Sequence, residues 1–596
     1  MVWKGIRSLV NLKNSNTSSY KIADNTGKHV SDQNKIANLF NDYFVKVGSS
    51  VEQKIPNTDK DFNEYLTNLK IDKTFFLSPT DKNEIMDIIK LFDINKSLGP
   101  NSIPIYILKV YKEFFSEKLF QLINISFEAG IFPDLCKLAK VIPIHKKDDK
   151  SSIFNYRPIS LLPLFSKIFE KIIYKRLYTY FNDNKLIYHQ QFGFRANHST
   201  NHALISLTEQ IKSKLDTGHY VGGIFIDLEK AFDTVNHTML CRKLEYYGIR
   251  GIPNLLIKSF LSNRKQYVSI NGFESNRKEI SCGVPQGSTL GPLLFLIYIN
   301  DFQYSLEKSK ASHFADDTNI LYASKSIKTI ETVLNHELKL ASTWLCANKL
   351  SLNEDKTKLI IFHSRNKVLN ENSISIKLNN KKLSLSKSVN YLGLSIDDCL
   401  SWNNHISNLS RKLSRANGIL SKLRYNAPKN VCISVYYSIF YSHINYGNSV
   451  WTLTSEENLN SIRILQKKCL RIINFSEFNA HTNELFSIDK LLKLDDVIEF
   501  NHLKIIFEFK NNLLPDTLNS LFLKSTDVHS YMTRNAKSSG LFIPTIQSVK
   551  HGNKSLRYMC PVSWNSFSRN NTFINQAKTL NQLKVKLKSH YVKSYI

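Results

Sequence analysis

Two adjacent carboxylates in a short turn of this chain predict a metal site. The quartet Phe314-Ala315-Asp316-Asp317 lies between two short apolar runs, residues 313–314 and 320–323, which is the pattern of a strand, a tight turn and a returning strand. Neighbouring acids resist joint ionisation unless a cation lies between them, and a divalent ion is the usual cation. Because an Asp-Asp pair is also common in an ordinary solvated turn, the interpretation needs further residues.

A third acid ends an apolar run upstream. Residues 221–226 predict a buried strand, and Asp227 follows it at the rim of the expected sheet. Alone, Asp227 could be a turn residue or a helix cap. Together with Asp316 and Asp317 it supplies the three carboxylates that two Mg²⁺ ions need against a nucleoside triphosphate. In phosphoryl transfer the protein mainly aligns the reacting groups and neutralises charge.

A glycine-containing loop lies between these acids in the sequence. Residues 283–287 read Gly-Val-Pro-Gln-Gly, and Gly287 permits a close approach of the backbone to a ligand. Ser288 or Thr289 can cap the helix that follows, and Pro292 is tolerated in the first turn of that helix. The apolar run 293–299 is far too short to span a membrane and predicts a core helix.

Taken in order, these segments resemble the motifs of reverse transcriptases. Residues 225–235 resemble motif A, residues 283–295 motif B and residues 314–317 motif C, in the form found in non-LTR (LINE-type) retrotransposons of the jockey and CR1 kind. The resemblance implies an α+β right-hand polymerase, with fingers and a palm whose antiparallel sheet carries the acids, followed by a mainly helical thumb and C-terminal region. It also implies an RNA-directed DNA polymerase that extends a DNA 3′-end on an RNA template with two Mg²⁺ ions, for which Mn²⁺ could substitute.

The same resemblance assigns roles to single residues. The metal ions are held by Asp227, Asp316, Asp317 and the backbone carbonyl of Leu228, and Lys356 in a segment similar to motif D protonates the leaving pyrophosphate. Nucleotide binding is assigned to three groups of residues. Arg157, with Lys146 or Lys147, forms a basic clamp on the triphosphate, and Phe232 forms a steric gate below the sugar. Gln286 and Gly287 of motif B lie beside the incoming nucleotide. Arginine suits bidentate phosphate binding and lysine acts as a point charge. Template and primer contacts are assigned to Arg195, Tyr391 and Gly393.

The composition agrees with a polyanionic partner. The 596 residues include 80 Lys and Arg against 50 Asp and Glu, a net charge of +30, which attracts nucleic acid but does not by itself identify a binding site. The eight cysteines are scattered without a Cys-x-x-Cys pair, which argues against a zinc knuckle or a disulfide framework and favours a reducing compartment. No signal peptide or transmembrane segment is expected.

The chain is long enough for several subdomains. We expect a mostly helical N-terminal extension over residues 1–125, a fingers and palm domain over 126–400, a basic helical thumb-like region over 401–510 and a C-terminal tail over 511–596. The residues before 140 lack the His, Asp, Glu and Asn pattern of the endonuclease that such elements carry upstream, and no RNase H acid set follows residue 400. The expectation is therefore a truncated element copy or a fragment that polymerises but does not cut.

The expected partners are an RNA template, a DNA primer or target DNA and dNTPs, with no membrane, in a nuclear or cytoplasmic ribonucleoprotein. The sequence predicts neither the oligomeric state, the template RNA nor the insertion site. An alternative is a catalytically inactive or repurposed nucleic-acid-binding protein derived from such an element, and another is a protein similar to an intron maturase. The complete set of acids, with Gly287 and Arg157, favours the enzyme.

Overall fold

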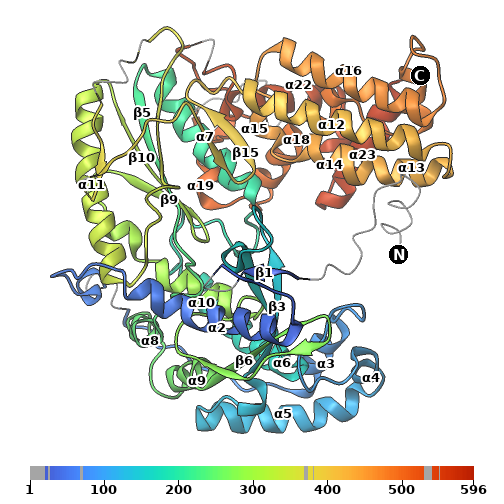
Figure 1. Cartoon of the computed structure of the whole chain (residues 1–596). Coiled ribbons are helices and arrows are strands. Elements are labelled where there is room, and N and C mark those ends of the chain that lie inside the picture. Colours follow the sequence, from blue (N-terminus) through green and yellow to red (C-terminus); the bar gives the residue numbers. More distant parts are fainter. Residues whose placement is uncertain are drawn as a thin grey trace.

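The computed structural model describes residues 20–23, 27–66, 71–367, 369, 374–379, 381–528, 540–548 and 551–595. It is a mixed α+β structure with two main sheets and a helical C-terminal half, as the sequence predicted (Figure 1). None of the helices in these ranges is both long enough and apolar enough to span a membrane.

A four-stranded antiparallel sheet, in the order β11-β5-β10-β9, forms one part of the molecule. Its strands are β5 (Tyr220–Ile226), β9 (Lys310–Phe314), β10 (Asp317–Ser324) and β11 (Lys358–Phe362). Alternate residues of β5 pack into different cores: Val221 and Phe225 on the face that helix α7 (Thr200–Asp216) covers, and Ile224 and Ile226 on the face of helix α11 (Ile327–Ala347). The predicted buried strand is therefore the central strand of a sheet covered on both faces.

A second sheet, in the order β4-β3-β6-β7 with β8 beside β6, lies in the lower part of Figure 1. Its strands are β3 (Leu138–His145), β4 (Tyr156–Leu161), β6 (Arg264–Ile270), β7 (Phe273–Glu274) and β8 (Lys278–Ile280), and only the β3–β6 pair is parallel. Helix α2 (Gln33–Glu52) packs Phe40 and Phe44 into a small core with Val141 and Val268 of this sheet. Its N-terminus is capped by Asp32, whose side chain accepts hydrogen bonds from two backbone N–H groups of the first turn.

Further helices share one hydrophobic core with the four-stranded sheet. They are α3 (Lys82–Lys90), α4 (Ile105–Val110), α5 (Lys112–Ala129), α6 (Leu164–Asp183), α8 (His237–Tyr246), α9 (Ile252–Leu261) and α10 (Leu290–Ile299). Nine of the ten residues of α10 are buried, which explains the uninterrupted apolar run that predicted a core helix. Smaller strand pairs are β1 (Ile22–Ala23) with β2 (His29–Val30), β12 (Lys377–Leu378) with β13 (Lys381–Lys382), and β14 (Ser388–Tyr391) with β15 (Leu394–Asp397).

The chain after residue 400 is helical. Its elements are α12 (Asn403–Leu423), α13 (Lys429–Val435), a π-helical segment (Tyr436–Tyr441), α14 (Ser442–Asn445), α15 (Asn448–Trp451), α16 (Glu456–Ile473), α17 (Asn483–Ile488), α18 (Leu494–Lys510), α19 (Asp516–Asn519), α20 (Ser525–Val528), α22 (Leu556–Asn570) and α23 (Leu580–Lys593). One hydrophobic core runs through α12, α16, α18, α22 and α23 and includes residues of α7. Because residues on both sides of position 510 share this core, the division of this half at that position stays a prediction.

Candidate active site

The four-stranded sheet brings the three predicted acids together. Asp227 directly follows β5, Asp316 lies in the turn between β9 and β10, and Asp317 begins β10. Strand β10 pairs with β5 so that Thr318 lies opposite Ile226, which places Asp317 next to Asp227 across the strands. All three acids line one cavity of about 960 Å³.

The electrostatics of these acids favour a bound cation. Burial, together with the nearby charge of Asp227, raises the pKa of Asp316. Burial, followed by the charges of Asp316 and Asp227, raises the pKa of Asp317 to about 6. The positive charges of Lys146 and Arg157 lower the pKa of both acids and so act against these effects. The cluster therefore resists full ionisation, and a divalent cation between the carboxylates would remove that penalty.

The backbone carbonyl of Leu228 takes no part in the bridge that this residue forms. Leu228 forms a bridge with Leu352, but the bonds of this bridge are made by its neighbours: Glu229 N–H donates to the carbonyl of Ser351 at 2.9 Å, and Asn353 N–H donates to the carbonyl of Asp227 at 2.8 Å. In this pattern the carbonyl of Leu228 points away from the partner strand. Three carboxylates and one carbonyl form an all-oxygen donor set, which suits Mg²⁺ or Mn²⁺.

Lys356 contacts the acid cluster directly. Its Nζ lies 3.4 Å from Oδ2 of Asp227, and both side chains are about half exposed, at 55% and 42%. A mobile ammonium next to the acids can neutralise charge or deliver a proton at this position.

A buried glutamine holds the turn that carries Asp316. Oε1 of Gln191 accepts hydrogen bonds from the backbone N–H groups of Gly193 and Ala315, each at 2.9 Å. A Cβ on Gly193 would come within 2.4 Å of the backbone nitrogen of Ala315, so only glycine allows this approach. Gln191 and Gly193 thus lie against the turn of the acids, four and two residues before Arg195, which the sequence assigned to the template.

The basic residues of the predicted clamp come from the five-stranded sheet. Arg157 lies on β4 with an exposed side chain, and Lys146 and Lys147 follow β3 in the adjacent loop. The backbone N–H of Lys146 donates to the carbonyl of Asn155 at 2.8 Å, which fixes the start of the loop. Burial, together with the charge of Arg157, lowers the pKa of Lys146. All three basic residues line the same cavity as the acids.

Phe232 and the motif B loop form a further wall of the cavity. The ring of Phe232 is stacked on Phe295 of α10, with ring centroids 4.4 Å apart. Nε2 of Gln286 donates to Oδ1 of Asp233 at 2.8 Å, and the backbone carbonyl of Gln286 accepts from the N–H of Ser160 at 2.8 Å. Gly287 has a φ of +132° beside β4, where a Cβ would lie 2.3 Å from the carbonyl oxygen of Ser160. Gln286 lines the cavity, whereas Gly287 lies behind it against β4.

The three residues assigned to template and primer lie outside this cavity. Nη1 of Arg195 donates to the backbone carbonyls of Tyr188 and Gln191 at 3.2 and 3.1 Å. Tyr391 is 4% exposed and packs edge-on against Phe225. Gly393 occupies the β14–β15 turn with a φ of +82°. Contacts of these residues with nucleic acid stay predictions.

The structure adds cavity residues that sequence analysis did not identify. Helix α2 of the N-terminal extension lines the cavity with Tyr43, Lys46 and Ser50, and Lys54 lines it from the turn just after this helix. Their spacing of three and four residues places them on one side of a helix. This periodicity was present in the sequence, but a polar stripe on a helix is ordinarily a solvent-facing surface.

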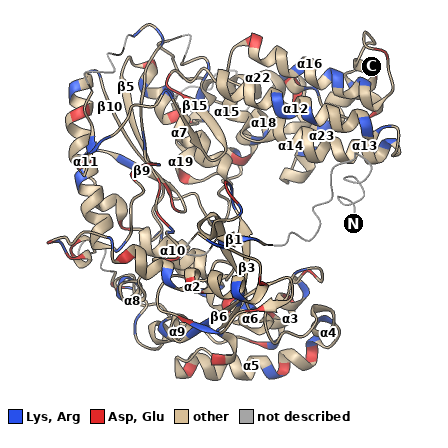
Figure 2. Ribbon diagram, viewed as in Figure 1, with Lys and Arg blue, Asp and Glu red and all other residues tan. Residues whose placement is uncertain are grey.

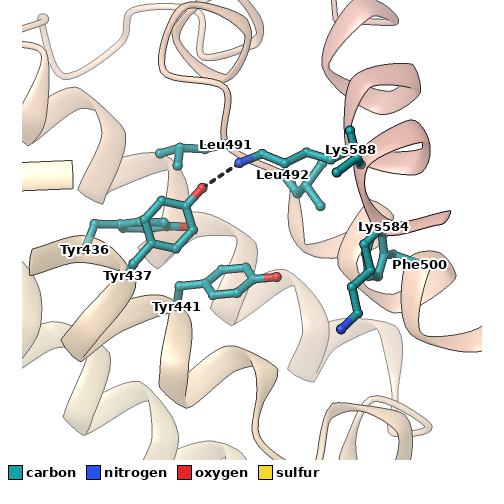
Figure 3. A pocket seen from close by; sticks show the side chains of 9 residues that line it. Tyr436, Tyr437, Tyr441, Leu491, Leu492, Phe500, Lys584 and Lys588 are labelled. Atoms are coloured by element: carbon teal, nitrogen blue, oxygen red, sulfur yellow. Dashed lines mark hydrogen bonds between the residues drawn. The ribbon is translucent and has the colours of Figure 1, made fainter. Parts of the chain in front are cut away.

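A second cavity has a different character. About 280 Å³ is enclosed between the π-helical segment and α23, and the labelled side chains in Figure 3 are aromatic, aliphatic or lysine. Tyr437 points toward Lys588, whose Nζ donates to the Tyr437 hydroxyl at 3.1 Å. Because no carboxylate lines this cavity, it does not have the chemistry of the acid site.

Comparisons with known proteins agree with the geometry. The family model "Reverse transcriptase (RNA-dependent DNA polymerase)" matches residues 144–396, which include all three acids. The chain is 30% identical over 443 residues to the RNA-directed DNA polymerase from mobile element jockey of Drosophila melanogaster, an alignment that covers 71% of this chain and 47% of that protein. The probable RNA-directed DNA polymerases from transposon BS and transposon X-element of the same species are 28% and 27% identical, over 70% and 71% of this chain and 47% of each relative. The chain thus spans about half the length of these curated relatives, and its residues 144–396 form a reverse transcriptase domain of the kind found in jockey-like non-LTR retrotransposons.

Proposed function

We propose that this chain is an RNA-directed DNA polymerase of a non-LTR retrotransposon, which extends a DNA 3′-end along an RNA template. The observation that carries the proposal is the convergence of Asp227, Asp316 and Asp317 on one cavity that Arg157 and Lys146 also line. The acids attract divalent cations and the basic residues attract phosphate, so one cavity has complementary sites for a metal–triphosphate complex.

The acids and the Leu228 carbonyl would hold two Mg²⁺ ions, or Mn²⁺ in their place. When bound, these ions supply activation of the 3′-hydroxyl and neutralisation of charge on the pyrophosphate. Asp227, Asp316 and Asp317 fix the position of this charge at the edge of the four-stranded sheet. Lys356, beside Asp227, delivers a proton to the leaving pyrophosphate.

The remaining cavity residues would bind and select the nucleotide. Arg157 offers a planar donor pair to phosphate oxygens, and Lys146 or Lys147 adds a point charge. Phe232, held by its stacking on Phe295, blocks the space that a ribose 2′-hydroxyl needs. Gln286 shapes the wall beside the incoming base, and Gly287 supports this loop from behind, against β4. Lys46 of α2 and Lys54 in the turn after it extend the basic surface.

We place template and primer contacts on Arg195, Tyr391 and Gly393 and on the basic helices after residue 400. In this proposal the five-stranded sheet acts as fingers, the four-stranded sheet as palm and the helical half as thumb. Figure 2 shows Lys and Arg distributed over both parts of the molecule, which suits contacts with a long polyanion. The partners would be RNA, DNA and dNTPs in a nuclear or cytoplasmic ribonucleoprotein.

A primer-extension assay tests the proposal. The purified chain is given a homopolymeric RNA template, a DNA primer, dNTPs and Mg²⁺, and is compared with Asp316→Asn and Asp317→Asn. We expect extension by the parent and a loss of at least about 10³-fold in both variants, because a ligand that stabilises several kcal/mol of developing charge is removed. Asp87→Asn, at an exposed pair on α3, is the matched control and should retain activity.

A binding measurement with the same template–primer distinguishes the alternative. The variants should still bind the duplex, since the acids do not contribute positive charge. Tight binding by all proteins without extension by the parent would contradict the polymerase and support the catalytically inactive nucleic-acid-binding protein.

A further inference from the structure

Three side chains with metal-binding chemistry meet outside the acid cavity, where β11 approaches the β14–β15 hairpin. His363 directly follows β11, and Asp398 and Cys399 directly follow β15. One ligand atom of each, an imidazole nitrogen, a carboxylate oxygen and Sγ, lie within 4.8 Å of one another. Nε2 of His363 and Oδ2 of Asp398 are 3.8 Å apart.

Backbone hydrogen bonds hold the two segments in this arrangement. The N–H of His363 donates to the carbonyl of Asp398 at 3.0 Å, and the N–H of Asp398 donates to the carbonyl of Lys387 at 3.1 Å. The three donors are therefore positioned by the ends of regular strands. They do not depend on a chance contact between long side chains.

The imidazole is also oriented for a metal. Nδ1 of His363 lies 3.0 Å from the carbonyl oxygen of Ser364. The tautomer that donates from Nδ1 to this carbonyl leaves the lone pair of Nε2 directed toward Asp398. A histidine whose second nitrogen donates to a carbonyl is the usual arrangement of a metal ligand in proteins.

We propose that His363, Asp398 and Cys399 bind one Zn²⁺ ion, with water in the fourth position. Mixed sulfur, nitrogen and oxygen donors are the ligands that Zn²⁺ takes in tetrahedral sites, and the thiolate disfavours Mg²⁺. Bond lengths of about 2.0–2.3 Å require donors roughly 3.5 Å apart. Because all three side chains are partly exposed, changes of their side-chain torsion angles can bring the donor atoms closer together.

The surroundings accommodate the ion. His363 and Asp398 line a cavity of about 210 Å³ that has room for the bound water. With one carboxylate and one thiolate the occupied site carries no net charge, so Lys387 on the cavity wall does not oppose it. This site is formed by two segments that meet only in the fold, so the sequence spacing of the cysteines does not indicate it.

Occupation would join the edge strand β11 to the hairpin that carries Tyr391 and Gly393. This is a structural role and is independent of nucleotide transfer. The test of the zinc site and the primer-extension assay are therefore independent, and either can fail without the other.

Cobalt spectroscopy tests the site on the full chain. Co²⁺ added to the reduced, metal-free protein should give a thiolate-to-cobalt charge-transfer band in the near ultraviolet, with a final intensity that corresponds to one thiolate-bound cobalt ion per chain, and the band should disappear on addition of Zn²⁺. The acid cavity cannot produce this band, because its donors are oxygen atoms. Cys399→Ser should abolish the band and His363→Gln should weaken cobalt binding at least tenfold, whereas Cys346→Ser, at another partly exposed cysteine, should leave both unchanged.

An alkylation experiment needs no variant. Saturating Zn²⁺ should slow the modification of Cys399 by iodoacetamide at least tenfold, as quantified by peptide mass spectrometry, and should leave Cys346 unaffected. A cobalt spectrum without a charge-transfer band, a band that survives Cys399→Ser, or equal alkylation of Cys399 with and without Zn²⁺ would each overturn the proposal.

Discussion

At the residue scale, protons and metal ions compete for the same carboxylates. The pKa of Asp317 is raised from its ordinary value of 3.8 to about 6 by burial and by Asp316 and Asp227, and the pKa of Asp316 is raised for the same reasons. A cation can bind only when these protons are displaced. The function of the site therefore depends on pH in a range where isolated aspartates are fully ionised.

We expect the affinity for Mn²⁺ to fall as the pH decreases from 7 through 6 to 5. Because the pKa of Asp317 is raised, the folded, metal-free chain keeps the proton of this carboxyl between about pH 4 and 6, where the unfolded chain has lost it. The contribution of Asp317 to the free energy of unfolding, measured as the difference between the parent and Asp317→Asn, should therefore decrease as the pH rises through this window. Calorimetric titration with Mn²⁺ at several pH values checks the first expectation, and denaturant unfolding with a chelator checks the second. A constant affinity from pH 5 to 7 would contradict the assignment, and Asp317→Asn should flatten the pH dependence of the affinity.

The sugar selection assigned to Phe232 also belongs to this scale. Phe232→Ala should raise kcat/KM for ribonucleotides relative to deoxyribonucleotides at least about tenfold, because the ring that occupies the space of the 2′-hydroxyl is removed. Single-nucleotide incorporation with dNTPs and rNTPs measures this ratio. Phe194→Ala is the control, since that ring contacts Phe232 edge-on with centroids 6.2 Å apart but is itself exposed. An unchanged ratio in Phe232→Ala would remove the gate role.

At the element scale, the β9–β10 turn needs external support. Ala315 has a φ of +57°, a conformation that residues other than glycine rarely adopt, and its N–H is held by Gln191. The segment 191–195 is therefore part of the structure that positions Asp316. A sequence pattern shows that this segment exists, but only the fold shows that it contacts the turn.

Gln191→Met should reduce the rate of nucleotide transfer more than it weakens binding of the template–primer. The variant keeps the size of the side chain but leaves the N–H groups of Gly193 and Ala315 without an acceptor, at a cost of about 1–3 kcal/mol each. Single-turnover kinetics and denaturant unfolding measure the two effects. Gln210→Met, at a partly buried glutamine of α7, is the control and should change neither the rate of nucleotide transfer nor the stability. If Gln191→Met had the parental kcat, the β9–β10 turn would not need the hydrogen bond to Gln191.

The position of helix α2 at the acid cavity could not be predicted from the sequence. The sequence predicted a mostly helical N-terminal extension, but it did not predict that Tyr43, Lys46 and Lys54 lie at the acid cavity. Helical periodicity defines which residues share a face and leaves open what that face contacts. The contact is decided by the packing of Phe40 and Phe44 on the five-stranded sheet.

At the scale of the whole molecule, polar contacts join helix α22 and the segment before it to helix α7, which covers one face of the sheet that carries the acids. Asp216 at the end of α7 pairs with Arg557 at 2.8 Å and accepts the N–H of Ser548 at 2.7 Å. Glu209 accepts the N–H groups of Leu556 and Arg557 at 2.9 and 3.3 Å. Residues more than 300 positions apart thus share polar contacts at the edge of a common core.

We expect Asp216→Ala to lower the free energy of unfolding by about 3 kcal/mol, because a buried carboxylate with a charged partner is removed and the partner loses its counter-charge. Far-ultraviolet circular dichroism and tryptophan fluorescence should report one coincident transition in both the variant and the parent. Glu245→Ala, at an exposed pair with Arg242, should change the stability by less than about 1 kcal/mol. Two separate transitions would contradict a shared core.

The sequence by itself determined the acids, their order and the local elements around them. Two local patterns carried this information: an apolar, partly β-branched run that ends in Asp227, and a pair of acids between apolar runs. Such patterns can be recognised in a single sequence, because hydrophobic periodicity follows the geometry of the backbone. The apolar helix after Gly287 was predictable for the same reason, and the resemblance to reverse transcriptases followed from the three motifs together.

Only the tertiary structure decided which distant segments meet. The register of β10 on β5, the contact of Gln191 with the acid turn, the place of α2 at the cavity and the meeting of His363 with Asp398 and Cys399 all depend on the simultaneous packing of elements far apart in the chain. Such contacts leave no periodic signal, because their energy comes from complementary surfaces that exist only after the chain has folded.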